Sequence, residues 1–108
     1  RPAGDPGRVV RGERGKERAV IGRRLPDFHQ GDEWPRMEEG DYMLCPDSAR
    51  EPGEVFLRPP GEAIGRISPK IHTITWNDDG TITVAPSIFF NAPTGWHGYL
   101  ERGVWRKV

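Results

Sequence analysis

Apolar and polar residues alternate most regularly near the C-terminal end of this chain. Residues 71–76 read Ile-His-Thr-Ile-Thr-Trp and residues 81–84 read Thr-Ile-Thr-Val. Between them lies the turn-forming run Asn-Asp-Asp-Gly at 77–80. Period-two alternation of β-branched and aromatic residues around such a turn predicts a β-hairpin over about 71–85.

The hydrophobic pattern also predicts how the two strands of this hairpin pair. A three-residue loop that ends with Gly80 in the left-handed conformation places Trp76 opposite Ile82. Ile74 then lies opposite Val84, and all four apolar side chains share one face. A shift of one residue would mix the two faces, so the pattern selects this register.

The same pattern returns over residues 96–107, which predicts a second hairpin. A three-residue loop at 101–103 would put Gly103 in the position that Gly80 takes in the first hairpin. This loop pairs Leu100 with Val104.

The middle of the chain, residues 26–69, is interrupted by Pro or Gly every few residues, so helices of ordinary length are not expected there. Two segments have the composition of short strands, 41–45 and 54–57, and 64–67 is a weaker third. We therefore expect a mostly β protein with little helix.

Length and composition predict one small domain. The chain has 108 residues, of which 34% are apolar, with 14 Gly and 11 Pro. A chain of this length builds one hydrophobic core at most, and this composition makes that core small. We expect an irregular Gly-, Pro- and Arg-rich arm at 1–25, followed by a small β domain at 26–108.

The net charge of zero hides an uneven distribution. Residues 1–24 hold eight basic and three acidic side chains, and the rest of the chain carries the balancing negative charge. Such an arm can fold back on its own domain, contact a protein partner, or contact phosphate non-specifically. It contains no aromatic residue on which a base could stack, which argues against sequence-specific reading of nucleic acid.

Cysteine content and hydropathy restrict where the protein works. Cys45 is the single cysteine, so an internal disulfide cannot form and a reducing, cytoplasmic compartment is expected. No apolar run is long enough to span a bilayer, and no signal segment opens the sequence. We expect no membrane partner.

Ser87 and His97 are the residues on which we would place chemistry. A serine hydroxyl becomes a nucleophile when a base, usually His, lies within about 2.6 to 3.2 Å of it. His97 follows Ser87 by ten residues, across the Pro- and Gly-containing segment 93–95 that turns the chain back. The sequence therefore predicts a Ser/His dyad, with backbone N–H groups near Ser87 as the oxyanion hole. The structural alternatives are a serine that bonds nearby backbone and a histidine that packs at a rim.

The other histidines and the nearby carboxylates are candidates for an alternative base and for a third catalytic residue. His72 is a competing base but falls on the apolar face of the first hairpin, and His29 lies in a loop without an identifiable partner. Three carboxylates could orient the imidazole in a triad, and the sequence does not choose among them. They are Asp78, Asp79 and Glu101.

One cysteine and three histidines without paired spacing do not match a zinc site, and no glycine-rich phosphate loop precedes a helix. We expect neither a metal nor a cofactor.

Short motifs in the last part of the chain resemble a small domain family of phages and bacteria long described as of unknown function. The matching order is a threonine-rich strand with Pro-Ser-Ile at 81–88, Gly-Trp-His-Gly-Tyr-Leu at 95–100, and Gly-Val-Trp at 103–105. Members encoded beside ubiquitin-like conjugation operons look like serine peptidases that cut ubiquitin-like proteins. The resemblance maps the family's serine onto Ser87 and its histidine onto His97.

Many relatives carry further cysteines, of which only Cys45 has a counterpart here, so the resemblance implies no cysteine-bound metal in this chain.

Three function classes follow. The first is a serine peptidase or hydrolase that acts on a peptide or isopeptide bond, in the cytoplasm of a bacterial host. The second is a non-enzymatic phage accessory or virion protein, whose β module and basic arm bind a protein partner. The third is a small factor that contacts nucleic-acid phosphate through the arm.

Overall fold

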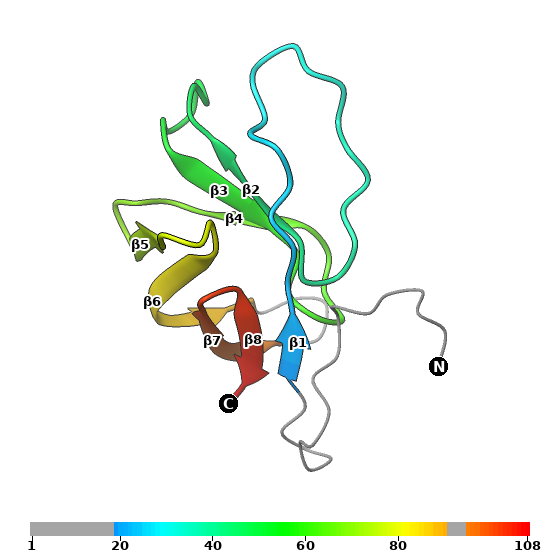
Figure 1. Ribbon diagram of the computed structural model, residues 1–108, viewed down its shortest axis with the longest axis vertical. Helices are drawn as coiled ribbons and strands as arrows, with labels where there is room; N and C mark the ends of the chain where they lie inside the picture. The colour runs from blue at the N-terminus through cyan, green and yellow to red at the C-terminus, as the bar shows by residue number, and fades with distance from the viewer. Residues whose placement is uncertain (1–18, 91–94) are drawn as a thin grey trace.

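A computed structural model of the protein describes residues 19–90 and 95–108. Within these ranges the chain forms eight strands and no helix, in two antiparallel sheets that lie one above the other in Figure 1. The predicted small, mostly β domain is confirmed. No helix in the described ranges could cross a membrane.

The larger sheet has five strands in the order β1-β8-β7-β6-β5. Its strands are β1 (Ala19–Ile21), β5 (Thr73–Trp76), β6 (Ile82–Phe89), β7 (His97–Glu101) and β8 (Val104–Lys107). The smaller sheet has the order β2-β3-β4, with β2 (Tyr42–Cys45), β3 (Glu54–Leu57) and β4 (Gly65–Ile67). The three short strands expected in the middle of the chain are therefore all present.

The first hairpin has the predicted register. Trp76 lies opposite Ile82 and Ile74 lies opposite Val84. Gly80 closes the loop with a φ of 88°, the left-handed conformation that the bulged turn requires.

The second hairpin corrects our prediction. Its loop has two residues, Arg102 and Gly103, with φ values of 47° and 78°. Positive φ at both positions is typical of the tight turn whose twist matches the flanking strands. Leu100 therefore lies opposite Trp105 and not opposite Val104. Both Leu100 and Trp105 are fully buried, so this register puts the larger apolar pair into the core.

The two hairpins are joined into one sheet by β6. Pairing with β5 ends at Ala85, just before Pro86, which agrees with the hairpin predicted over about 71–85. The strand nevertheless runs on to Phe89 and pairs with β7, after a register shift between Val84 and Ile88. Ser87 therefore lies inside a strand, where we had expected the strand to end before it.

Part of the predicted arm belongs to the domain. Residues 1–18 and the predicted turn residues Pro93 and Thr94 lie outside the described ranges. Ala19–Ile21 form β1 against β8, and the Gly22 N–H donates to the Gly103 carbonyl oxygen at 2.7 Å. The folded domain thus begins before the boundary that we predicted at residue 26.

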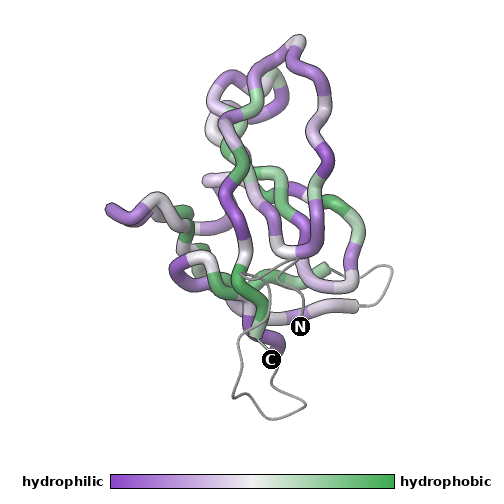
Figure 2. The backbone as a smooth tube through the Cα atoms, turned by 45° about the vertical axis from the view of Figure 1, so that its right-hand side comes forward, coloured by the Kyte–Doolittle hydropathy of each residue, from purple (hydrophilic) through white to green (hydrophobic). Residues whose placement is uncertain are grey.

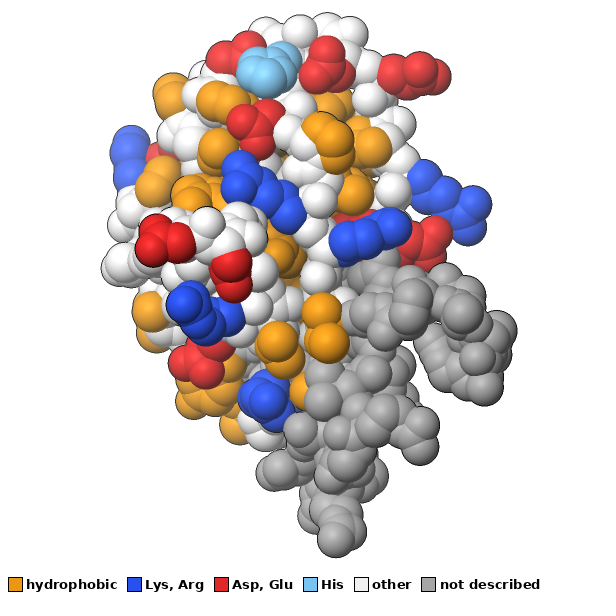
Figure 3. All heavy atoms as spheres, viewed as in Figure 1, with side chains coloured by type: hydrophobic (Ala, Val, Ile, Leu, Met, Phe, Trp, Pro, Cys, Tyr) orange, Lys and Arg blue, Asp and Glu red, His pale blue; other side chains and the backbone are white. Residues whose placement is uncertain are grey.

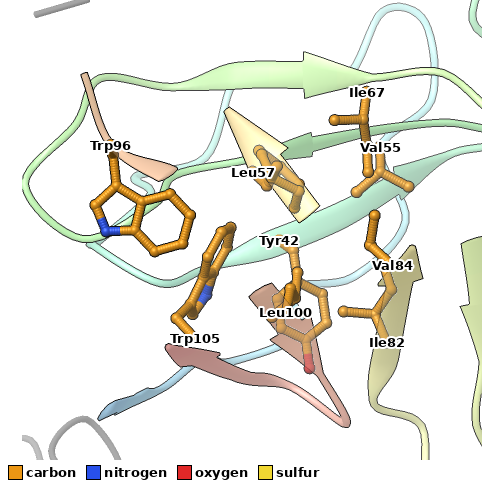
Figure 4. Close-up of a cluster of buried hydrophobic side chains, with 10 residues drawn as sticks. Tyr42, Val55, Leu57, Ile67, Ile82, Val84, Trp96, Leu100 and Trp105 are labelled. Atoms are coloured by element: carbon orange, nitrogen blue, oxygen red, sulfur yellow. The ribbon is translucent and has the colours of Figure 1, made fainter. Parts of the chain in front are cut away.

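The hydrophobic core fills the space between the two sheets (Figure 4). The smaller sheet contributes Tyr42, Val55, Leu57 and Ile67, and the larger sheet and the residue before β7 contribute Ile82, Val84, Ile88, Trp96, Leu100 and Trp105. Figure 2 shows that the loop at the top of that view is largely hydrophilic. The indole N–H of Trp105 donates to the Gly40 carbonyl oxygen at 2.8 Å, so the polar group of this buried ring has a hydrogen-bond partner.

Candidate active site

Ser87 and His97 lie in direct contact. The distance from Ser87 Oγ to His97 Nε2 is 2.9 Å, within the range of a hydrogen bond, and the pair is exposed to solvent. The contact that the spacing predicted is therefore present. An open hydroxyl beside an imidazole nitrogen is the arrangement that a general base needs.

Strand alternation places both side chains on the outer face of the larger sheet. In β6, Ile88 is buried while Ser87 and Phe89 point outward, and in β7 Gly98 is buried while His97 is exposed. His97 lies opposite Phe89, so Ser87, two residues earlier, is its diagonal neighbour. Diagonal neighbours are within reach of a long side chain, and the imidazole spans the gap.

The His97 ring also contacts an aromatic side chain. The ring centroids of His97 and Phe89 are 5.7 Å apart, with an interplanar angle of 88°. This edge-to-face contact restricts the ring on one side while Ser87 Oγ bonds it on the other. The sequence reasoning missed Phe89, although its place two residues after Ser87 on the same strand would have shown that the two share a face.

Position 98 has no room for a side chain, which explains why a glycine follows the histidine. A Cβ at this position would lie 2.3 Å from the Arg106 carbonyl oxygen and 2.5 Å from the Trp96 ring. The missing side chain lets the buried Trp96 ring pack beneath the strand. The backbone N–H of Trp96 donates to Glu62 at 3.3 Å, so the chain is anchored immediately before His97.

The carboxylates considered for a triad lie elsewhere. Glu101 stands opposite Val104 at the other end of β7. Asp79 accepts hydrogen bonds from the Thr81 backbone N–H at 3.0 Å and from the Thr81 hydroxyl at 2.5 Å, and these bonds lower the pKa of its carboxyl. Asp78 is exposed at the same hairpin tip. Among the described residues, no carboxylate hydrogen-bonds to the His97 ring, so the arrangement is a dyad.

The other histidines do not join the site. His72 lies in the turn before β5, where its backbone N–H donates to the Ser68 carbonyl oxygen at 3.0 Å. No hydrogen bond links its ring to Ser87. His29 is half exposed in a turn, with its Nδ1 at 3.8 Å from Asp32 Oδ2.

Metal and thiol chemistry have no support in the described ranges. No group of three His, Cys, Asp or Glu side chains there could hold a metal ion. Cys45 is buried, and burial together with the nearby Glu54 and Asp47 carboxylates raises its pKa to about 11. A thiol with that pKa stays protonated at neutral pH and is a poor nucleophile.

Comparison with known proteins does not assign a family. No protein-family model, curated protein or solved structure matches this chain. The resemblance to the phage and bacterial family therefore stays a prediction that depends on short motifs.

Proposed function

We propose that this protein is a serine hydrolase in which Ser87 is the nucleophile and His97 is the general base. The observation that supports the proposal is the 2.9 Å contact between Ser87 Oγ and His97 Nε2 on an open face of the sheet. An exposed, directly bonded pair can meet a large substrate without any part of the domain moving.

The reaction follows from the roles of the two side chains. His97 Nε2 accepts the hydroxyl proton as Ser87 Oγ attacks the acyl carbon, which forms a tetrahedral intermediate. The protonated imidazole then gives that proton to the leaving amine as the carbon–nitrogen bond breaks. Water, deprotonated by His97, hydrolyses the resulting ester and restores the serine.

The oxyanion is stabilised by backbone N–H groups next to the nucleophile. Pro86 and Ser87 have no register partner on either neighbouring strand, because pairing with β5 stops at Ala85 and pairing with β7 resumes at Ile88. Irregular backbone of this kind can direct an N–H group toward a ligand. The Ser87 N–H is the donor we assign.

The substrate class is an amide within or between proteins. By its resemblance to the family described above, the protein cuts a peptide or isopeptide bond at a ubiquitin-like protein. The exposed position of the dyad suits a macromolecular substrate better than a small one, since pockets for small ligands enclose most of the ligand's surface.

An alkyl fluorophosphonate reagent tests the nucleophile. Wild type should be labelled covalently at Ser87, and Ser87→Ala should not be labelled. His97→Asn should react roughly 10² to 10⁴ times more slowly, because the base is lost. Thr75→Val is the matched control, since it removes an exposed hydroxyl from the edge strand β5 of the same sheet, away from His97, and should label like wild type.

The second test measures turnover. A ubiquitin-like protein fused to a C-terminal peptide should be cleaved by wild type and left intact by Ser87→Ala. Equal rates for the two proteins would refute the proposal.

A protein-binding module is the alternative that a specific observation favours. Phe89 and Tyr99 are 62% and 48% exposed on the same outer face, and exposed aromatics of this kind are common at interfaces. If wild type is not labelled while substitution of Phe89 or Tyr99 weakens binding of a protein partner, this function replaces the first.

The phosphate-binding alternative depends on the arm, most of which lies outside the described ranges. On the face shown in Figure 3, basic and acidic side chains are interspersed among hydrophobic ones. That mixture is not the single-sign surface that binds phosphate.

A further inference from the structure

Among the residues that the structure describes, the half of β6 that carries Ser87 has a neighbouring strand on one side only. The edge strand β5 begins at Thr73, opposite Ala85, whereas β6 continues to Phe89. Just before β5 the chain turns away, and the N–H groups of Ile71 and His72 both donate to the Ser68 carbonyl oxygen. In the described ranges, no strand is registered against β6 beyond Ala85 on that side.

The hydrogen bonds of β6 show which of its backbone groups face this open edge. The Phe90 N–H donates to the Trp96 carbonyl oxygen at 2.8 Å, so Phe90 is turned toward the β7 side. Backbone groups alternate along a strand, so the N–H and C=O of Phe89 point the other way, toward the open edge. The carbonyl of His97, opposite Phe89, accepts from the Val108 N–H at 2.9 Å and is correspondingly turned away from β6.

A cavity of about 340 Å³ lies along this edge. Its apolar lining includes Ile67 from β4, Ile71 from the turn, and Ile88 and Phe90 from β6 or just after it. The lining also includes polar and charged side chains, among which Arg66 Nε lies 3.7 Å from Glu54 Oε2. An apolar side chain that enters the cavity would contact the four apolar residues.

We propose that the substrate polypeptide binds as an extended strand added to the open edge of β6, paired with Phe89, with one apolar side chain in the cavity. Folded proteins normally cover or charge an open edge, because unpaired backbone groups attract another chain. Here the edge stands beside the Ser87 hydroxyl. Main-chain hydrogen bonds give affinity in this binding mode, and the pocket for alternate side chains gives selectivity. The inference depends on the proposed hydrolase function and adds the conformation and side chain of the substrate.

Two reagents separate the inference from the proposed function. One is a bare aryl phosphonate, and the other is an N-acetyl Leu-Val-Leu peptide ending in the same aryl phosphonate. If the substrate adds as a strand, the peptide reagent should gain about tenfold in apparent affinity for Ser87 over an otherwise equal phosphonate without the peptide. Replacing the leucine whose side chain enters the cavity by glycine should remove several-fold of that gain.

Methylation of the reagent's own backbone tests strand pairing on the unmodified protein. Successive N–H groups of a strand point to opposite sides, so N-methylation at one of two adjacent peptide residues should abolish the gain, and at the other it should have little effect. Equal labelling by both methylated peptides, or no gain from the peptide at all, overturns the inference while labelling by the bare reagent leaves the hydrolase standing. Absence of labelling by both reagents overturns the hydrolase itself.

A pair of variants tests the protein side of the edge. Phe89→Ala and Phe89→Pro both remove the aromatic ring, and only the second also removes the N–H that faces the edge. The ratio of labelling by the peptide reagent to labelling by the bare reagent should be several-fold lower in Phe89→Pro than in Phe89→Ala. Equal ratios in two folded variants would contradict the assignment of Phe89, and the methylated peptides decide the matter if Phe89→Pro does not fold.

Discussion

The two faces of the strand pair β6 and β7 differ in what they do for the protein. On the inner face Ile88 lies opposite Gly98, and Leu100 packs into the fully buried core. On the outer face, one residue away along each strand, Ser87 and His97 form an exposed hydrogen-bonded pair. The same backbone therefore supplies stability on one side and candidate chemistry on the other. Substitutions on the two faces should separate these properties.

The largest effect is expected on the inner face. Leu100→Ala should lower the free energy of unfolding by about 2 to 5 kcal/mol, because it removes buried methyl groups and leaves a cavity between the sheets. The neighbouring outer-face change Tyr99→Ala is the control, and it should cost less than about 1 kcal/mol. Urea unfolding followed by tryptophan fluorescence measures both. Similar losses for the two variants would mean that the faces are not distinct.

The next largest effect is expected at Gly98, an inner-face residue that directly follows His97. Gly98→Ala should destabilise the protein by about 1 to 3 kcal/mol, because the added Cβ meets the Arg106 carbonyl oxygen and the Trp96 ring. It should also slow labelling of Ser87, since Trp96 and His97 are adjacent. Gly31→Ala serves for comparison: it has open space around it and a φ of 93°, so it carries only the backbone cost. Thermal unfolding and reagent labelling distinguish packing loss from backbone strain.

A smaller effect is expected at Phe89, on the outer face. Phe89→Ala should reduce the rate of labelling of Ser87 by a bare fluorophosphonate roughly 3- to 10-fold, because the edge-to-face contact that orients the His97 ring is lost. Its free energy of unfolding should change by less than about 1 kcal/mol, since the side chain is 62% exposed. Phe89→Tyr keeps the ring and should restore most of the rate. A rate unchanged in Phe89→Ala would show that Ser87 alone positions the histidine.

The smallest effect is expected at the turn that sets which residues face inward on β8. Arg102 has a φ of 47°, a conformation that asparagine adopts more easily than arginine. Arg102→Asn should therefore raise the free energy of unfolding by about 0.5 kcal/mol. The control is Arg106→Asn, on the outer face of the same hairpin, which has an ordinary strand conformation. A loss of stability in Arg102→Asn would argue against the two-residue turn.

Some of the fold could be predicted because the information was local. In the first hairpin, the alternation of Ile74 and Trp76 with threonines, together with Gly80 in the loop, is enough to select one register. The ten-residue spacing of Ser87 and His97 was enough to predict that the two side chains could meet. That both side chains lie on the same face of the sheet was not predictable, because the register shift between Val84 and Ile88 changes which residues of β6 face outward.

Other features depended on distant parts of the chain. The second hairpin also has polar residues before its glycine, Glu101 and Arg102, and this local pattern favoured the wrong loop. Burial of Leu100 and Trp105 together, with the Trp105 indole bonded to Gly40, decides the pairing. Similarly, Ala19–Ile21 look like part of a basic arm until β8 supplies a partner.

The sequence by itself determined the strand-rich class, the first hairpin and the identity of the two residues that we assign to catalysis, because alternation, turn residues and functional groups are properties of neighbours. Only the tertiary structure decided the register of the second hairpin, the joining of both hairpins through β6, and the open edge beside Ser87. These depend on which side chains the opposite sheet covers and on where β5 stops, and no local stretch of residues contains that information.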